Sequence, residues 1–269
     1  MSDGIELNGL VVRAGDTELV RGVSLSVRPG QIVALVGQSG SGKSLTARSL
    51  LGMVEIDPGV VQADLRIHRG DTTLTPYAEC LGKGSRARSR AFRTVRGSVV
   101  GYLAQDARAA LDPLFRVAHQ VRTAAKLSGS SVDPLPYLKR AGFADPARVA
   151  RLYPHELSGG MAQRAVIAQA LARGSQYLLA DEPTTGLDPT VQHAILNELR
   201  RLADTGIGVV LITHDLRVLP GLADHVVILH KGRVVERCTT DALQRGELES
   251  EAGMRLVRAT RRVAGGALG

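Results

Sequence analysis

Residues 33–50 read VALVGQSGSGKSLTARSL, and this stretch decides the fold of the chain. Its apolar start, residues 33–37, predicts a buried strand. Residues 43–51 contain neither Gly nor Pro and predict a helix. The loop between them, GQSGSGKS at residues 37–44, fits the pattern G-x-x-x-x-G-K-[ST]. A strand, a glycine-rich loop and a helix in this order predict a backbone cradle for phosphate, whereas a chance Gly/Ser-rich loop would lack both flanking elements.

The residue types of this loop suit a nucleotide. Glycines let backbone N–H groups turn toward phosphate oxygens without a clash at Cβ, and the helix start adds its positive dipole end. Lys43 would reach the β- and γ-phosphates, and Ser44 would offer its hydroxyl to Mg²⁺. The predicted nucleotide-binding residues are Gly37, Gln38, Ser39, Gly40, Ser41, Gly42, Lys43, Ser44 and Leu45.

A second segment, YLLADEP at residues 177–183, supplies carboxylates at the end of an apolar run. A buried strand that ends in acidic residues completes the Mg²⁺ shell of many phosphate-binding folds. Asp181 would then bind Mg²⁺ through water, and Glu182 would orient or deprotonate an attacking water. Acidic residues are also common at helix starts, so only the pairing with the phosphate loop makes this prediction specific.

Composition limits the fold and the location of the chain. With 269 residues, 44% of them hydrophobic, it can form one large α/β domain, or a core with a smaller subdomain. Only 3% of the residues are aromatic, so Leu, Val, Ala and Ile must build the core. We find no signal-peptide pattern and no apolar run near the roughly 20 residues needed to cross a bilayer. We therefore expect a cytoplasmic protein whose membrane association comes through a partner.

The formal net charge of +8 suits nucleic acid, anionic lipid or phosphorylated ligands, and does not choose among them. The densest basic cluster, residues 83–97, has few interleaved aromatics and matches no nucleic-acid module. We interpret it as a charged surface segment. The two cysteines, Cys80 and Cys238, have no CxxC spacing and are expected to be free thiols.

Strands alternate with helices along the chain, and the strands are almost continuously apolar, which favours a mainly parallel sheet covered on both faces. Residues 69–97 are expected to be irregular, and a hairpin is expected to turn at Lys231 and Gly232. The predicted strands are 5–12, 23–37 with a turn at 28–31, 60–68, 99–105, 177–180 and 208–215; the predicted helices are 43–51, several short ones in 112–152, 159–172 and 190–203.

The segment LSGGMAQR, residues 157–164, identifies the family. Ser158 is a good helix N-cap, but a cap does not explain two glycines followed by Gln163 and Arg164. Here the sequence resembles the ATP-binding cassette (ABC) family, whose signature is LSGGQ or close to it. The family's motifs occur in the expected order along nearly the whole chain: the phosphate loop at 37–44, Gln105, the signature at 157–161, LLADE at 178–182, GLD at 186–188 and His214.

The resemblance implies an α/β fold with a P-loop NTPase (RecA-like) core and a mainly parallel sheet, an N-terminal antiparallel β subdomain and an inserted α-helical subdomain. We expect a single ABC domain over residues 1–269. Its parts are the β subdomain with the first half of the core in 1–105, the helical subdomain with the start of the signature in 106–160, the second half of the core in 161–238, and a C-terminal tail in 239–269.

The resemblance also implies roles within a dimer. Ser158, Gly159 and Gly160 match the residues that bind the γ-phosphate of an ATP held by the opposite subunit. Asp188 matches the loop aspartate that communicates across the dimer. Two cassettes, identical or different, would meet head to tail around two ATP molecules; ATP binding closes the dimer and hydrolysis reopens it.

Further roles concern the reaction itself. Gln105 matches the glutamine that touches Mg²⁺ and the attacking water and senses the membrane partner, and His214 matches the switch histidine at the γ-phosphate. The catalytic residues are therefore expected to be Glu182, His214 and Gln105. The expected Mg²⁺ ligands are Ser44, Gln105 and Asp181.

Residues 107–120, 152–164 and 180–192 resemble the dipeptide, oligopeptide and nickel importer group of the family. This resemblance implies an ATPase subunit that powers uptake of peptides, nickel or metal–chelator complexes. It would lie on the cytoplasmic side of the inner membrane under two permease subunits, which residues 105–117 would contact. An extracellular or periplasmic substrate-binding protein would be an indirect partner.

Two departures and two alternatives stay open. The family's adenine-stacking aromatic is absent near Ala14, where Arg13 could stack instead, and residues 242–263 depart from the group's C-terminal pattern. A soluble ABC ATPase, such as an accessory of phosphonate breakdown, would carry the same motifs. A nucleic-acid ATPase would carry a long coiled coil between phosphate loop and signature, and because no sustained heptads occur there, we expect no nucleic-acid partner.

Overall fold

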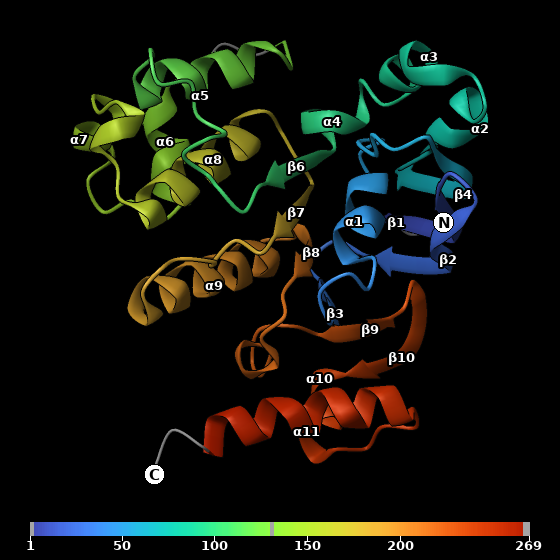
Figure 1. Cartoon of the computed structure of the whole chain (residues 1–269). Coiled ribbons are helices and arrows are strands. Elements are labelled where there is room, and N and C mark those ends of the chain that lie inside the picture. Colours follow the sequence, from blue (N-terminus) through green and yellow to red (C-terminus); the bar gives the residue numbers. More distant parts are fainter. Residues whose placement is uncertain (1–2, 130–131, 266–269) are drawn as a thin grey trace. The chain divides into compact units, whose positions relative to one another are not determined.

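The computed structural model describes residues 3–129 and 132–265, and it forms two compact units (Figure 1). The first unit comprises Met1–Arg93 and Val210–Gly269, and the second comprises Thr94–Val209. The boundaries expected after residues 105, 160 and 238 do not coincide with this division and stay predictions. Within the described ranges, no helix is both long and apolar enough to cross a membrane.

The first unit contains the N-terminal antiparallel sheet. Its strands are β1 (Gly4–Ala14), β2 (Thr17–Val27), β4 (Pro58–Arg69) and β5 (Thr72–Leu74), in the order β2-β1-β4-β5. Side chains alternate between buried and exposed along much of β1, as they do in a sheet with one face on the core. The expected antiparallel β subdomain is therefore confirmed.

Parallel strands carry the phosphate loop in the same unit. The strand β3 (Ile32–Gly37) pairs in parallel with β9 (His225–His230), and β10 (Arg233–Thr239) pairs antiparallel with β9 across the predicted hairpin at Lys231 and Gly232. Every residue of β3 is buried, because an apolar run without alternation can lie only in the interior. The helix α1 (Lys43–Ser49) follows directly.

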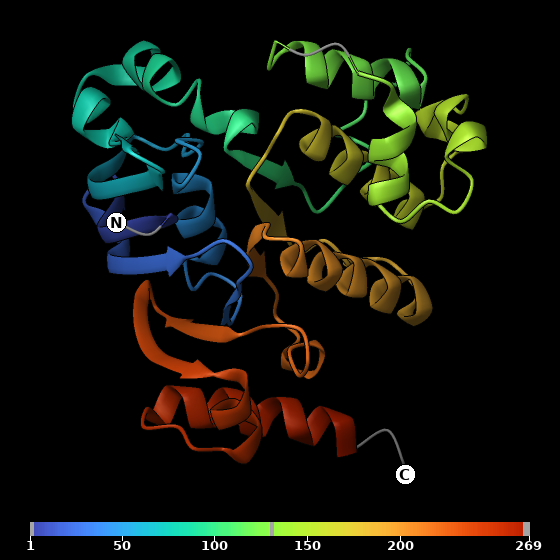
Figure 2. The same cartoon turned by 180° about the vertical axis from the view of Figure 1, so that it is seen from behind.

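The C-terminal segment of the first unit is helical. The short helix η2 (Leu216–Val218) follows the strand at Gly208–Ile212, and α10 (Thr240–Arg245) follows β10. The helix α11 (Glu251–Gly265) runs alongside β10 in both views (Figures 1 and 2). The strand β8 (Gly208–Ile212) begins in the second unit and ends in the first.

The expectation of irregular structure over residues 69–97 is wrong. This stretch contains β5, α2 (Pro76–Cys80), α3 (Gly84–Ala91) and the start of α4 (Val95–Ser98). Two aromatic side chains, Tyr77 and Phe92, hold this stretch against the core. Both are fully buried, and their rings pack edge to face with centroids 4.9 Å apart. The Tyr77 hydroxyl donates to the Ser49 carbonyl at 2.8 Å. Two aromatics 15 residues apart carry no periodic signal, so the polar residues around them dominated the prediction. The helix α3 itself buries no residue, as expected of a charged surface segment.

The second unit combines two parallel strands with most of the predicted helices. The strand β6 (Val100–Leu103) pairs in parallel with β7 (Tyr177–Asp181), so the carboxyl ends of both strands meet at one edge. The helices α5 (Val117–Lys126), α6 (Pro134–Arg140) and α7 (Pro146–Ala150), followed by the short helix η1 (Pro154–Glu156), are the short helices predicted in this region.

Two longer helices of the second unit match the sequence-based predictions within one residue. The helix α8 (Gly159–Ala172) is buried on nearly all sides and is contacted by α5 and α6, which gather around it in both views (Figures 1 and 2). The helix α9 (Pro189–Asp204) begins right after the GLD segment. The mainly parallel α/β core is thus present in both units.

Candidate functional site

The phosphate loop of the first unit holds a buried cation. The buried strand β3 ends at Gly37, and Gly42 starts α1 with φ 99°, a left-handed conformation that glycine adopts without strain. Lys43 is only 7% exposed, and its Nζ donates to the carbonyls of Gly37 at 2.8 Å and Gln38 at 3.0 Å. The ammonium group therefore lies against the loop's own backbone, where a phosphate group would be bound.

The loop also fits a phosphate group sterically and chemically. A Cβ on Gly37 would collide with the Leu229 carbonyl and the Ser41 hydroxyl, so the close turn requires glycine. The Ser41 side chain is 4% exposed, and no described residue bonds its Oγ. A buried hydroxyl without a partner is unfavourable, and an anion oxygen is the kind of group that satisfies it.

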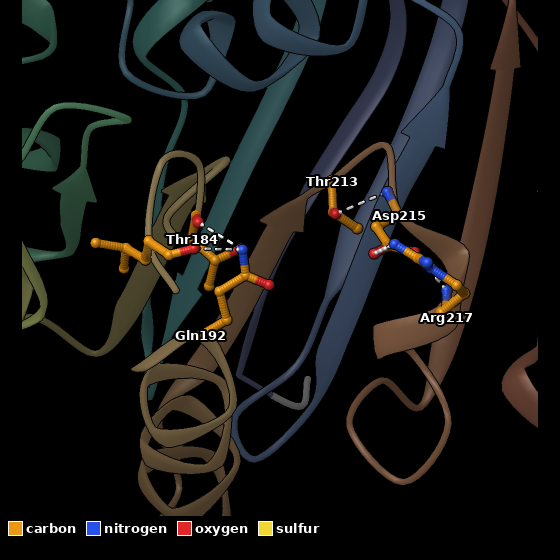
Figure 3. Close-up of polar contacts among 6 residues, drawn as sticks. Thr184, Gln192, Thr213, Asp215 and Arg217 are labelled. Atoms are coloured by element: carbon orange, nitrogen blue, oxygen red, sulfur yellow. Dashed lines mark hydrogen bonds and ion pairs between the residues drawn. The ribbon is translucent and has the colours of Figure 1, made fainter. Parts of the chain in front are cut away.

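His214 is exposed and belongs to the first unit. Its chain neighbours Thr213 and Asp215 are held in place by hydrogen bonds (Figure 3). The Thr213 hydroxyl accepts from the backbone N–H of Asp215 at 3.1 Å. The Asp215 carboxylate accepts from Arg217 Nε at 2.8 Å and Nη2 at 2.7 Å, and this hydrogen-bonded guanidinium lowers the pKa of Asp215. The predicted switch histidine is thus anchored through its two chain neighbours.

The predicted Mg²⁺ ligand Asp181 is the last residue of the buried strand β7 in the second unit, and the predicted base Glu182 follows it. Asp181 is 4% exposed, and its Oδ2 accepts from the Tyr102 hydroxyl on β6 at 3.1 Å. Glu182 is half-buried and has φ 48°, an uncommon value for a residue other than glycine. Its carboxylate accepts from the Thr185 hydroxyl at 3.0 Å. The adjacent carboxylates of Asp181 and Glu182 therefore have different hydrogen-bond partners.

The signature residues open the helix α8. Ser158 is exposed, and its Oγ accepts from the backbone N–H of Met161 at 3.3 Å, so the serine does cap the helix. The two glycines also have a packing role: a Cβ on Gly159 would meet Leu187 Cδ2 at 2.6 Å, and one on Gly160 would collide with Val191. Sequence analysis assigned these glycines to phosphate binding alone and missed this contact with the segment around α9.

A pocket of about 540 Å³ in the second unit brings several predicted residues together. Segments 105–108, 158–163 and 183–191 line it. Asp188 caps α9 at the edge of this pocket by accepting from the Val191 N–H at 3.0 Å. The predicted residues that share the pocket are Gln105, Ser158, Gly159, Gly160 and Asp188. Residues 37–45 and His214 belong to the first unit, and Asp181 and Glu182 belong to the second.

Side chains that sequence analysis missed hold the loops of this pocket. Gln163 Nε2 donates to the carbonyls of Pro183 at 2.9 Å and Ala104 at 3.3 Å. Gln192 Nε2 donates to the carbonyls of Leu187 at 2.9 Å and Thr184 at 3.3 Å (Figure 3).

Two more contacts escaped prediction. Arg108 Nη2 donates to the Leu157 carbonyl at 2.6 Å, which connects the segment after Gln105 to the signature. The Tyr102 contact could have been found by aligning the two predicted strands 99–105 and 177–180, because parallel pairing places Tyr102 next to the end of β7. The glutamines and Arg108 give no such signal, since their partners are backbone carbonyls.

Arg13, the residue expected to replace the adenine-stacking aromatic, is paired. Its Nη2 lies 2.8 Å from Glu18 Oε1 across the hairpin of β1 and β2, and this guanidinium lowers the pKa of Glu18. Ala14, next to it, is half-buried. The stacking role of Arg13 stays a prediction.

Comparison with known proteins identifies the family. The model of the ABC transporter family matches residues 20–185. The oligopeptide transport ATP-binding protein OppD of Mycobacterium tuberculosis is 41% identical over 234 residues, which are 84% of this chain and 36% of that protein. A putative peptide import ATP-binding protein of Brucella abortus is 37% identical over 231 residues, 83% of this chain and 67% of that protein. The chain therefore spans about a third of the length of the first relative and two thirds of the second.

A solved structure agrees with this result. The ATP-binding subunit of an ABC transporter is 27% identical and aligns with a TM-score of 0.68 over 90% of this chain and 92% of its own. The expected P-loop NTPase fold is thereby confirmed. The signature at residues 157–164, the matching family model and the relatives agree, and the chain belongs to the ABC transporter family.

Proposed function

We propose that this chain is the ATP-hydrolysing, nucleotide-binding subunit of an importer for peptides, nickel or metal–chelator complexes. The observation that carries the proposal is the pocket of the second unit, which joins Gln105, the signature glycines and Asp188. An enzyme with a single complete site would not need a Mg²⁺-contacting glutamine, a second phosphate-binding helix start and the aspartate that communicates across a dimer in one pocket. A cassette that completes the nucleotide site of another cassette would need them.

The chemistry follows from the residues of each unit. Residues 37–45 would bind the phosphates of ATP, with the Lys43 ammonium neutralising their charge. Ser44, Gln105 and Asp181 would hold Mg²⁺, which would neutralise negative charge on the phosphate oxygens and so favour attack on phosphorus. The Tyr102 hydroxyl fixes the Asp181 carboxylate for this task.

Glu182 is the proposed general base. The Thr185 hydroxyl orients its carboxylate, which would take the proton from the attacking water. His214 would contact the γ-phosphate from its anchored loop. Both residues act on ATP bound in the same chain, whereas Ser158, Gly159 and Gly160 would contact ATP held by the other cassette of a homo- or heterodimer.

Two exposed apolar side chains in the second unit support the proposed contact with a membrane partner. Leu114 is 78% exposed and Phe115 43% exposed, both within the segment expected to contact a permease, and the Phe115 ring stacks on His119 at 4.5 Å. Large apolar side chains at an exposed loop are typical of a protein contact. Two permease subunits would place the chain on the cytoplasmic side of the membrane, with a substrate-binding protein outside as the indirect partner. Because the relatives are named for oligopeptide and peptide import, we put peptides first among the substrates.

The variant Glu182→Gln tests the ATPase part. It should bind ATP with unchanged affinity, lower the hydrolysis rate by about a hundredfold to ten-thousandfold, and accumulate an ATP-bound dimer. Phosphate release and light scattering after size exclusion measure these effects. Glu247→Gln in the exposed tail pair with Arg245 is the control and should hydrolyse ATP normally. An unchanged rate in Glu182→Gln would show that Glu182 is not the base.

Purification from membranes tests the importer part. The tagged chain should be recovered together with permease chains, and its ATPase rate should respond to peptide-loaded binding protein. Recovery with soluble enzymes or nucleic acid alone would contradict the proposal and favour a soluble ABC ATPase.

A further inference from the structure

Gln163 lies at the centre of the second unit and contacts two catalytic segments at once. Its side chain is 2% exposed and comes from α8, five residues after Ser158. One amide nitrogen donates to the carbonyl of Ala104, the residue before Gln105, and to the carbonyl of Pro183, the residue after Glu182. A single side chain therefore joins the signature helix to the segments that carry the proposed Mg²⁺ ligand and the proposed base.

The orientation of this amide is determined by its contacts. The reverse orientation would place the amide oxygen against two carbonyl oxygens, which repel it, so the nitrogen must occupy this position. Gln163 Oε1 is left buried, and no group among the described residues bonds it. An unpaired buried oxygen is unfavourable. The two bonds to backbone carbonyls are the only hydrogen bonds found for this side chain among the described residues, and an apolar residue could not make them.

The two hydrogen bonds of Gln163 hold the backbone next to Gln105 and Glu182, where small displacements would affect the reaction. Glu182 occupies an uncommon backbone conformation, and Pro183 follows it directly, so a bond to the Pro183 carbonyl holds that turn. Ala104 follows the last residue of β6 and precedes Gln105, so the second bond holds the start of the Gln105 segment. A proton acceptor and a water-contacting amide must keep their mutual distance to act on one water molecule.

We propose that Gln163 is a positioning residue: through one amide nitrogen it keeps Gln105 and Glu182 in a fixed relation to each other and to the signature helix. The inference rests on the proposed ATPase function. It predicts that loss of the amide lowers the hydrolysis rate and leaves ATP binding intact, because the phosphate loop belongs to the first unit.

The test compares Gln163→Met with Gln169→Met in the full chain. Methionine keeps the length of glutamine and removes its donors. Gln169 is the matched control, since it lies on the same helix and its amide contacts Gln120 instead, at 3.4 Å. We expect kcat for ATP to fall about tenfold to a hundredfold in Gln163→Met, with the affinity for a fluorescent ATP analogue within twofold of the unmutated chain. Gln169→Met should keep its kcat within threefold.

Hydrogen exchange gives a readout that does not depend on turnover. Amides of residues 104–108 and 184–188 should exchange faster in Gln163→Met, and those of residues 37–45 should not change. Gln163→Asn keeps the amide on a shorter side chain that reaches one carbonyl at most, so its kcat and exchange should be intermediate. This variant also serves if Gln163→Met does not fold.

The outcomes separate this inference from the proposed function. Unchanged exchange at 104–108 and 184–188, or equal loss of kcat and melting temperature in the Gln163 and Gln169 variants, would overturn the positioning role. If the unmutated chain hydrolyses no ATP, the proposed function fails, and the exchange experiment still decides whether Gln163 holds the two segments.

Discussion

The phosphate loop of the first unit and the carboxylate loop of the second, residues 181–188, are held in opposite ways. Lys43 contacts Gly37 and Gln38, which are 6 and 5 residues away in the chain. Asp181 is held by Tyr102, 79 residues away, and Pro183 by Gln163, 20 residues away. The side-chain contacts of Lys43 are therefore local in the chain, although the Gly232 N–H also bonds the Ser41 carbonyl of this loop. The contacts of Asp181 and Pro183 depend on the packing of other elements.

This difference predicts how substitutions in each loop affect ATP binding and the rate of hydrolysis. A substitution in the phosphate loop removes a group that would touch the ligand, so binding should suffer. A substitution around the carboxylate loop leaves the acidic groups in place and moves them, so the rate should suffer while binding persists. Two substitutions test the comparison, and a third tests the contacts beside His214.

The largest effect is expected for Lys43→Ala. Loss of a buried ammonium inside the loop should weaken ATP binding by about tenfold to several hundredfold, as expected for losing one or two hydrogen bonds to a charged group. Titration with a fluorescent ATP analogue measures the affinity. Lys83→Ala is the control, because this exposed lysine donates to the Glu79 carbonyl far along the chain from the loop. Equal affinity in both variants would break the comparison.

An intermediate effect is expected for Tyr102→Phe. This substitution keeps the ring and removes the hydroxyl that donates a hydrogen bond to Asp181. We therefore expect kcat to fall by about tenfold, with ATP affinity nearly unchanged. Steady-state phosphate release at several ATP concentrations separates the two quantities. Tyr137→Phe on α6 removes a hydroxyl from the same unit and should leave kcat as it is. A rise in KM with constant kcat would instead assign Tyr102 to binding.

The smallest effect is expected for Arg217→Met beside His214. Arg217 lowers the pKa of Asp215, so the pair stabilises the folded chain above the ordinary carboxyl pKa of about 3.9 and loses this effect as the pH falls through the lowered value. Because Arg217 is 60% exposed, the variant should lose less than about 1 kcal/mol of unfolding free energy at pH 7. Urea unfolding at pH 7 and at pH 3 measures the difference. A loss of equal size at pH 3 and at pH 7 would exclude the ion pair as its cause.

Prediction from the sequence succeeded where the signal was local. The strand and helix on either side of the phosphate loop, the buried strand up to Asp181 and the helix of residues 159–172 were each predicted from neighbouring residues, and the structure contains them. Prediction was wrong over residues 69–97, because Tyr77 and Phe92 order that stretch by meeting each other and Ser49 in the core. The residues next to Tyr77 or Phe92 in the sequence carry no signal that these two side chains pack against each other.

The sequence by itself determined which groups are present: a lysine in a glycine-rich loop, two carboxylates after a strand, and a serine with two glycines before a helix. The tertiary structure decided what holds them, namely Tyr102 on Asp181, Gln163 on Pro183 and Ala104, and the contact of Gly160 with Val191. The physical reason is the range of each interaction. Backbone conformation depends on near neighbours, whereas a side-chain hydrogen bond to a distant carbonyl exists only after strands have paired and helices have packed.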